Sequence, residues 1–324
     1  MSYRIFLTGS GIAEAAREHL RNNNCVFETG DPKDTPEDLI RKLDGFRPHA
    51  LIVRQGKISR EVQAAAPDLK VICKHGVGTD NIDIEAATER GIPVLFTPNA
   101  NYQSAAEHTV ALLFALSRNV VSETTRIRGG LFDKKLYSGL ELGGKTLGIV
   151  GYGKIARRFA ELVAPLGMTI LVYHPSGRAE YPPYLRRVGD PEELIREADV
   201  ISLHCPLNAE TREMINRETI SRMKTGAMII NTARGELIRE ADLVEALGSG
   251  KLRGAALDVF AQEPPEMSGP LFQLDNVILS THVAGMSDRS TLNMAMESAA
   301  NVLAILNGQA VDPASVKNPG ALED

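Results

Sequence analysis

The stretch T-L-G-I-V-G-Y-G-K-I-A, residues 146–156, decides the fold. A short apolar run leads directly into two closely spaced glycines, and a helical pattern follows them. Gly151 allows a tight turn, Gly153 lets the backbone approach a pyrophosphate, and the small Ala156 permits close helix–strand packing. The N-terminus of the helix adds unpaired N–H groups and a partial positive charge. The stretch therefore predicts a strand–loop–helix unit that binds a dinucleotide.

Strand-like runs alternate with helical patterns along the whole chain, which is typical of parallel α/β sheets. The first series predicts strands at 3–7, 50–54, 70–73 and 93–96 and helices at 12–21, 36–43 and 82–90. The second series predicts six strands, the number in a complete dinucleotide fold, at 146–150, 169–173, 199–203, 227–231, 254–258 and 277–279. Long helices are expected at 104–118, where Ser104 and Glu107 form a capping box, and at 287–306. The expected fold class is α/β, with two Rossmann-like, doubly wound parallel-sheet domains.

Composition excludes several functional classes. The 324 residues include 36 Lys and Arg against 41 Asp and Glu, a net charge of −5, with no basic block that would favour nucleic acid. Three distant cysteines suit neither a disulfide framework nor a zinc site, so we expect no metal and a reducing, cytoplasmic location. The sequence contains no apolar run of 18 residues, so we predict no membrane span. The first residues form a strand pattern rather than a signal peptide.

The strand after the phosphate loop leaves the choice of cofactor open. It ends at His174, where this fold usually has an acid for the ribose 2′-hydroxyl. The run H-P-S-G-R contains no carboxylate, and Ser176 and Arg178 offer contacts to a 2′-phosphate. Alternatively, Arg178 is a solvated loop residue and NAD is used. Both NAD(H) and NADP(H) therefore remain candidates.

Three late segments place reactive side chains after predicted strands. Arg234 follows I-I-N-T-A, Asp258 and Glu263 lie in A-L-D-V-F-A-Q-E-P, and His282 follows V-I-L-S-T. In an open α/β sheet such loops surround the ligand crevice. An Arg binds a substrate carboxylate and polarises a carbonyl, and a His paired with a carboxylate supplies a proton near neutral pH. The set suits hydride transfer to a 2-keto acid.

The order G-x-G-x-x-A, N-T-A-R-G, D-V-F-x-x-E-P and T-H-x-A-G resembles the D-isomer-specific 2-hydroxyacid dehydrogenases. Further family-like segments are G-V-G-T-D-N-I-D (76–83), S-A-A-E-H-T (104–109), L-G-G-K-T-L-G-I-V-G-Y-G (142–153) and L-H-C-P-L-N-A-E-T (203–211). The resemblance implies that Arg234 binds substrate, that Glu263 pairs with His282, and that His282 is the acid/base. It implies that Asp258 holds the nicotinamide amide. It also implies that the Val77 and Gly78 amides hold the substrate carboxylate.

The resemblance also predicts the cofactor contacts and the domain order. The candidate cofactor-binding residues are Gly151, Tyr152, Gly153, Lys154, Ile155, His174, Pro175, Ser176, Arg178, Cys205, Pro206, Thr211, Thr232, Ala233, Asp258, Ala284 and Gly285. The implied organisation is a discontinuous substrate domain, 1–100 with 288–324, and a dinucleotide-binding domain, 101–287. Family members are usually homodimers with the segment around 120–145 in the contact. The chain departs from the family in having Ser280-Thr281 before His282, where Thr-Pro is common.

The substrate is expected to be a small 2-keto or D-2-hydroxy acid, with hydroxypyruvate, glyoxylate and 3-phosphohydroxypyruvate as candidates. Arg54 and Lys74 follow predicted strands at positions like those of the phosphate-binding cations in phosphoglycerate dehydrogenase, which favours a second anionic group. Alternatively, Arg54 meets only the common carboxylate and Lys74 is solvated. The main functional alternative is a dinucleotide-sensing, corepressor-like scaffold without turnover. Formate chemistry is disfavoured because position 263 has Glu and not Gln, and phosphite chemistry because position 77 has Val and not Lys.

Overall fold

A computed structural model describes residues 2–176 and 180–322. The chain divides into two compact units, Met1–Asn101 with Met286–Asp324 and Tyr102–Gly285. These bounds differ by one or two residues from the expected 100/101 and 287/288 divisions. The helix that follows the second division is capped by Ser287, whose side chain accepts a hydrogen bond from the Ser290 N–H.

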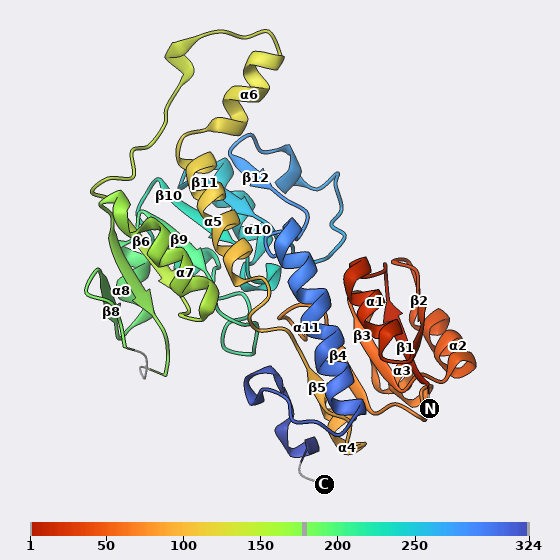
Figure 1. The fold of residues 1–324 in the computed structure, drawn as a ribbon. Helices are drawn as coiled ribbons and strands as arrows, with labels where there is room; N and C mark the ends of the chain where they lie inside the picture. Colours follow the sequence, from red (N-terminus) through yellow and green to blue (C-terminus); the bar gives the residue numbers. More distant parts are fainter. Residues whose placement is uncertain (1, 177–179, 323–324) are drawn as a thin grey trace. The chain divides into compact units, whose positions relative to one another are not determined.

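Unit 1 contains a five-stranded, fully parallel sheet in the order β2-β1-β3-β4-β5 (Figure 1). Its strands are β1 (Tyr3–Thr8), β2 (Cys25–Thr29), β3 (Ala50–Val53), β4 (Val71–Lys74) and β5 (Val94–Leu95). Its helices are α1 (Glu14–Asn22), α2 (Pro36–Phe46), α3 (Arg60–Ala64), α4 (Ile84–Glu89) and α11 (Asp288–Leu306). One buried cluster lies under α1 and α11 and another under α2 and α3, so helices cover both faces of the sheet.

Unit 2 contains a seven-stranded parallel sheet in the order β12-β11-β10-β9-β6-β7-β8. Its strands are β6 (Thr146–Val150), β7 (Thr169–Tyr173), β8 (Leu185–Val188), β9 (Val200–Leu203), β10 (Ala227–Asn231), β11 (Leu252–Leu257) and β12 (Val277–Leu279). Its helices are α5 (Tyr102–Ser117), α6 (Val120–Arg128), α7 (Lys154–Val163), α8 (Pro191–Glu197), α9 (Arg217–Arg222) and α10 (Glu240–Gly248). Both sheets are doubly wound, which confirms the expected fold class.

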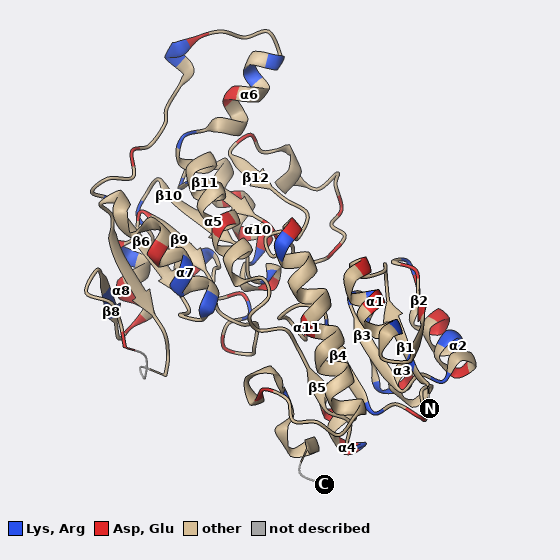
Figure 2. Ribbon diagram, in the orientation of Figure 1, with Lys and Arg blue, Asp and Glu red and all other residues tan. Residues whose placement is uncertain are grey.

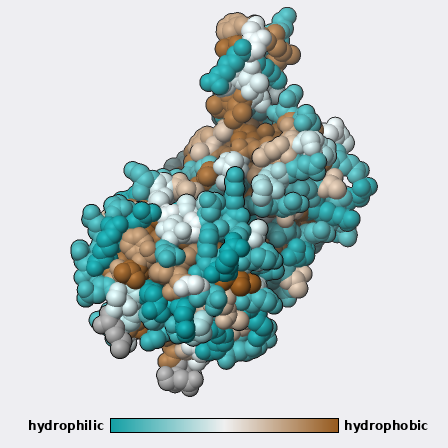
Figure 3. Space-filling view, turned by 90° about the vertical axis from the view of Figure 1, so that its right-hand side faces the viewer, coloured by the Kyte–Doolittle hydropathy of each residue, from teal (hydrophilic) through white to brown (hydrophobic). Residues whose placement is uncertain are grey.

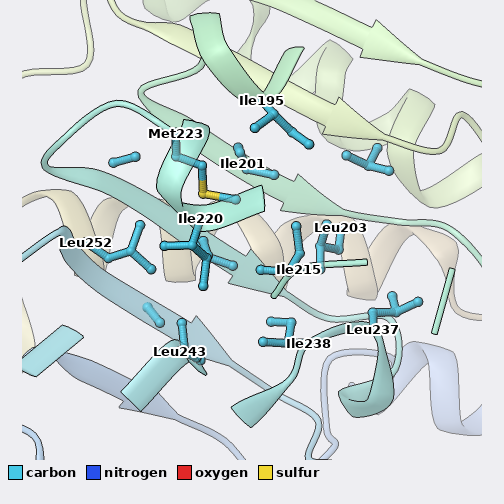
Figure 4. Close-up of a cluster of buried hydrophobic side chains, with 14 of the residues drawn as sticks. Ile195, Ile201, Leu203, Ile215, Ile220, Met223, Leu237, Ile238, Leu243 and Leu252 are labelled. Atoms are coloured by element: carbon cyan, nitrogen blue, oxygen red, sulfur yellow. The ribbon is translucent and has the colours of Figure 1, made fainter. Parts of the chain in front are cut away.

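The core of unit 2 has two layers. Side chains of α5 and α7 pack on one face of the sheet, and those of α8, α9 and α10 pack on the other. Figure 4 shows part of the second layer, to which the helices contribute Ile195, Ile220 and Leu243 and the strands Ile201, Leu203 and Leu252. All the strands of this sheet are buried on both faces except at its edges, which explains their continuous apolar runs.

The structure adds elements that the sequence pattern did not predict. The strands β2 and β8 complete the edges of the two sheets, and the helices α3, α6 and α9 join the predicted ones. The capping box predicted at Ser104 is wrong, because α5 begins at Tyr102 and places Ser104 within its first turn. Acidic and basic residues are interspersed over the elements of each unit (Figure 2). Within the described residues, no helix is long and apolar enough to span a membrane.

The strand order places the ligand-binding edge of each unit. In a doubly wound sheet, ligands bind beyond the carboxyl ends of the strands where the winding reverses. This point lies between β6 and β9 in unit 2 and between β1 and β3 in unit 1. We therefore expect a ligand to bind at the loops that leave these strands.

Candidate functional site

The loop after β6 has the geometry that a pyrophosphate needs. Gly151 has a φ of +95°, and a Cβ there would lie 2.6 Å from the carbonyl oxygen of His204 in the loop after β9. Nothing lies within 4 Å of the position that a Cβ of Gly153 would occupy. Gly153 is also the N-cap of α7 and provides no side-chain hydrogen bond to its first turn. The N–H groups of the first turn of α7 thus face the open space beside Gly153, an arrangement that fits a dinucleotide phosphate at the predicted residues Gly151 to Ile155.

Tyr152 differs from its neighbours in this loop because its side chain is buried. Its ring stacks on Tyr181 with 4.8 Å between centroids, and the Arg157 guanidinium lies 5.1 Å from its centroid. The side chain thus belongs to the packing of α7, and only the backbone of Tyr152 is available to a cofactor. Ala156 is fully buried against the sheet, as the third small position of the motif requires.

The loop after β7 contains the residues predicted to select the cofactor. His174 Nδ1 lies 2.9 Å from the hydroxyl of Ser176, with Pro175 between them. Arg178 lies outside the described residues. Where this fold usually has an acid, the loop thus has a hydrogen-bonded pair of polar side chains, His174 and Ser176.

Hydrogen bonds between its own residues stabilise the loop after β9. Thr211 donates from Oγ1 to the carbonyl of Pro206 at 2.7 Å and accepts from the Asn208 N–H at 2.8 Å. Cys205 is buried, with Sγ 3.8 Å from the sulfur of Met214, and burial raises the pKa of its thiol to about 11. These residues shape the wall beside the phosphate loop, and Cys205 remains a thiol at neutral pH.

The loop after β10 holds Arg234 in place through its neighbours. The Asn231 side chain donates to the Arg234 carbonyl at 2.7 Å and accepts from the Ala233 N–H at 3.0 Å. A Cβ at Gly235 would lie 1.9 Å from the carbonyl carbon of Phe260, so only glycine fits between this loop and the next. Arg234 is thereby fixed beside the loop that contains Glu263.

Glu263 and His282 form a hydrogen-bonded pair. Their Oε2 and Nδ1 atoms are 2.7 Å apart, and the Phe260 N–H donates to the other carboxylate oxygen at 3.1 Å. Burial of Glu263 raises its pKa, but the hydrogen bond from His282 and the positive charges of His282 and Arg234 outweigh it and leave the pKa below its ordinary value. The carboxylate is thus ionised at neutral pH and fixes the orientation of the imidazole ring.

Asp258 organises the loop that contains His282. Its side chain is 0% exposed, and its oxygens accept from the Ser280 hydroxyl at 2.6 Å and from the Val283 and Ala284 N–H groups at 2.9 and 2.7 Å. Its backbone carbonyl accepts from the His282 N–H at 2.8 Å. The contacts of Asp258 within the chain therefore hold residues 280–284, where His282 adopts a φ of +55°.

Sequence reasoning missed two members of this group, His108 and Ser280. His108 Nε2 on α5 lies 3.0 Å from the Ser280 hydroxyl, and the next residue, Thr109, lies 3.1 Å from Thr232 between hydroxyl oxygens. His108 lies in the family-like segment S-A-A-E-H-T, but nothing in that segment indicates a partner 172 positions away.

In unit 1, the predicted cations Arg54 and Lys74 bind the protein itself. The Arg54 guanidinium donates to the carbonyl of Gly11 and to the hydroxyl of Ser10, both at 2.5 Å, and so joins the loops after β1 and β3. Lys74 Nζ donates to the Arg54 carbonyl and to Asn81 Oδ1, each at 3.1 Å. Both side chains thus stabilise the ends of the strands.

The loop after β4 contains Val77 and Gly78. The hydroxyl of the buried Thr97 donates to the Gly76 carbonyl at 3.1 Å and accepts from the Gly76 N–H at 3.0 Å, which anchors this loop. No acceptor in the described part of the chain takes a hydrogen bond from the N–H of Val77 or Gly78. These two amides are available to a carboxylate.

Several known proteins are similar to this chain in sequence and in fold. Residues 110–284 match the family model described as "D-isomer specific 2-hydroxyacid dehydrogenase, NAD binding domain". The hydroxypyruvate reductase of Thermotoga maritima is 40% identical over 300 residues, 91% of this chain and 95% of that protein. A D-3-phosphoglycerate dehydrogenase of Archaeoglobus fulgidus is 37% identical over 306 residues, 93% of this chain and 57% of that protein. The crystal structure of the TT0316 protein from Thermus thermophilus superimposes with a TM-score of 0.88 at 36% identity, over 97% of this chain and 99% of that one.

The chain spans about half the length of the phosphoglycerate dehydrogenases it matches. It spans nearly the full length of the hydroxypyruvate reductase. The matched region of the family model covers more than half of the chain and contains the phosphate loop, Arg234, Glu263 and His282. The chain therefore belongs to the D-isomer specific 2-hydroxyacid dehydrogenase family, and residues 110–284 are its NAD-binding domain.

Proposed function

We propose that this chain is an NAD(P)-dependent oxidoreductase that transfers a hydride between a nicotinamide cofactor and a small D-2-hydroxy acid or 2-keto acid. The observation that carries the proposal is the 2.7 Å pair of Glu263 and His282 in the unit that also contains the open phosphate loop. A scaffold that only senses dinucleotides has no need for an acid/base pair. The pair therefore favours turnover over the scaffold alternative.

The proposed roles follow from the chemistry of the side chains. The bound cofactor supplies or accepts the hydride. In the reducing direction, protonated His282 donates its Nε2 proton to the carbonyl oxygen, because Nδ1 is engaged by Glu263. Arg234 binds the substrate and polarises its carbonyl. In unit 1, the free N–H groups of Val77 and Gly78 are the candidate carboxylate donors.

The contacts of unit 1 bear on the choice of substrate. Arg54 and Lys74 already donate to protein oxygens, and burial lowers the pKa of Arg54. This supports the reading in which these cations shape the loops rather than bind a second anionic group. We therefore propose glyoxylate or hydroxypyruvate as the substrate ahead of 3-phosphohydroxypyruvate.

The test is a titration of the purified protein with NADH and with NADPH, followed by each of the three keto acids. We expect the fluorescence of the reduced cofactor to change on binding, and glyoxylate or hydroxypyruvate to be reduced with a higher kcat/KM than 3-phosphohydroxypyruvate. Binding without turnover on any keto acid would favour the scaffold. If neither cofactor binds, the phosphate-loop assignment itself is wrong.

We also propose that the chain is a homodimer that associates through α6 and the segment after it. Figure 1 shows this part projecting from the sheet of unit 2, and Figure 3 shows apolar residues on it and around its base. None of the residues of α6 is buried. Its large exposed apolar side chains are Val120, Val121 and Ile127, and those of the segment after it include Leu131, Phe132 and Leu136. Because exposed apolar side chains that gather in one place often mark an interface, a second copy is the proposed occupant.

Light scattering after gel filtration tests the dimer. The wild type is expected at twice the 35.1 kDa chain mass. Phe132 is 79% exposed, so Phe132→Asp should shift the equilibrium towards monomer without unfolding unit 2. A wild-type monomer at micromolar concentration would exclude this proposal.

A further inference from the structure

A second histidine, His108, is linked to the same loop as His282. Its Nε2 atom lies 3.0 Å from the Ser280 hydroxyl and 3.7 Å from Asp258 Oδ1. The Ser280 hydroxyl lies 2.6 Å from that same carboxylate oxygen. The three side chains form a continuous chain from α5 to the end of β11, entirely within unit 2.

The hydrogen bonds define where the protons are. Ser280 has one hydroxyl proton, and it donates this proton to the Asp258 carboxylate. Its oxygen can therefore only accept from His108, so His108 Nε2 carries a proton. The imidazole thus directs an N–H group toward Ser280 and the buried carboxylate beyond it.

A completely buried carboxylate requires compensation. Asp258 is 0% exposed, whereas the His108 side chain is 26% exposed and reaches solvent. Without enough donors, an ionised group in this position would destabilise the fold or become protonated. The carboxylate oxygens take their other bonds from the Val283 and Ala284 N–H groups. A displacement of the Asp258 carboxylate would therefore loosen the backbone on the C-terminal side of His282.

We propose that His108 is a positioning residue for the reaction, acting through Ser280 and Asp258 to hold the 280–284 loop and so orient His282. Among the described residues it makes no hydrogen bond or ion pair with Glu263 or His282, and its proposed effect passes through the Asp258 carboxylate. This inference rests on the proposed oxidoreductase function for its kinetic test. The hydrogen bonds themselves are tested independently of turnover.

The experiment compares three substitutions at one position. His108→Gln keeps an N–H group at the reach of Nε2, His108→Asn places its amide too close to the backbone, and His108→Phe keeps the ring but has no donor. We expect Asn and Phe to lower kcat by about 10- to 100-fold with KM for the keto acid within about threefold. Gln should restore kcat to within about threefold of the wild type.

Three further variants guard against a folding defect. Ser280→Ala should reproduce the loss seen with His108→Phe, and Ser280→Thr, which keeps the hydroxyl, should restore it. Glu107→Gln changes the neighbouring exposed residue on α5 and should leave kcat unchanged. Equal kcat in His108→Phe and the wild type would overturn the proposal, and so would a Gln variant no better than Phe.

Amide hydrogen exchange separates this proposal from the proposed function. The peptide containing residues 280–284 should exchange faster in His108→Phe and Ser280→Ala than in the wild type, and at the wild-type rate in His108→Gln. If no keto acid is reduced by any form, the oxidoreductase proposal fails, while exchange still decides whether His108 holds the loop. Unchanged exchange in His108→Phe would refute that role.

Discussion

The imidazole Nδ1 of His282 lies 2.7 Å from Oε2 of Glu263, although 19 positions separate the two residues. The pairing depends on adjacent parallel strands, because β11 and β12 deliver their loops to the same edge of the sheet. It leaves Nε2 as the nitrogen available for proton transfer. In the proposed reaction, the carboxylate on one side of the ring thus leaves the nitrogen on the other side to transfer the proton.

Replacing the carboxylate should change the pH dependence of reduction. Glu263→Gln keeps the shape of the side chain but removes the negative charge that favours the protonated form of the His282 ring. Reduction requires the protonated ring, and its rate should therefore decline at a lower pH than in the wild type. The measurement is kcat/KM for reduction from pH 5 to pH 9, with the exposed Glu266→Gln as the control. A profile that stays in place would show that Glu263 does not tune His282.

Removal of the acid itself should abolish turnover but not binding. His282 has a φ of +55°, a conformation that asparagine tolerates better than alanine, so His282→Asn is the cleaner variant. We expect kcat to fall by about 10²- to 10⁴-fold, the usual contribution of general acid catalysis. The Kd of the reduced cofactor, measured by its fluorescence, should stay within about threefold. Equal losses of binding and turnover would contradict a purely chemical role.

Two glycines of the site should respond in opposite ways to alanine. A methyl group at Gly153 meets no atom within 4 Å, so Gly153→Ala should fold with a Tm close to that of the wild type, yet bind the cofactor at least about tenfold more weakly. A methyl group at Gly235 would lie 1.9 Å from the Phe260 carbonyl carbon, so Gly235→Ala should lower the Tm and the yield of folded protein. Calorimetry measures the Tm of both variants, and titration measures their affinity for the cofactor. Gly153→Ala with unaltered affinity would mean that the phosphate does not approach this backbone.

The sequence predicts the interior of both sheets well and their edges poorly. Buried parallel strands such as β10 read as continuous apolar runs, whereas β8 has the sequence L-R-R-V with both arginines exposed. The helix α6 was missed for a related reason, because none of its residues is buried and its pattern has no apolar face directed at the sheet. A pattern of apolar residues reveals an element only where its side chains are buried. These two elements have few or no buried side chains, so the pattern does not reveal them.

The candidate site divides along similar lines. Arg234, Glu263 and His282 could be found because each follows a strand that the pattern predicts, and parallel strands deliver their ends to one edge. The partnership of His108 with Ser280 could not, because it depends on how α5 lies across the sheet. The internal bonds of Arg54 were equally hidden, since its acceptors at Ser10 and Gly11 belong to the loop of another strand.

Stability should decline as the pH falls below neutrality. Burial lowers the pKa of both His75 and His204 to about 4, and for His75 the nearby positive charge of Arg54 adds to this effect. In the unfolded chain a histidine titrates near pH 6.5, so between about pH 6.5 and pH 4 only the unfolded state takes up these protons. Each histidine should therefore remove up to about 3 kcal/mol of unfolding free energy over that range.

Urea titrations at pH 7, 6 and 5 measure this slope. The lowered pKa of Glu263 contributes only at more acidic pH, so the histidines dominate the chosen range. His204→Gln removes one titrating group while keeping an N–H near the Ser202 hydroxyl, which lies 2.8 Å from His204 Nε2. The slope should be smaller in this variant than in the wild type. A slope equal to that of the wild type would show that His204 is not held neutral by burial.

Cofactor preference should depend on the charge at position 174. There the chain has a histidine hydrogen-bonded to Ser176 at 2.9 Å instead of an acid. In His174→Asp, the new carboxylate would accept a hydrogen bond from the ribose 2′-hydroxyl of NADH and repel the 2′-phosphate of NADPH. We expect the ratio of the Kd for NADPH to the Kd for NADH to rise at least about tenfold, since one repulsive contact of this kind amounts to about 1.4 kcal/mol. His174→Asn has nearly the same shape as the Asp variant without its charge and should leave the ratio near the wild-type value. If Asn and Asp shift the ratio equally, charge is not the determinant, and the adenosine end of the cofactor does not lie against this loop.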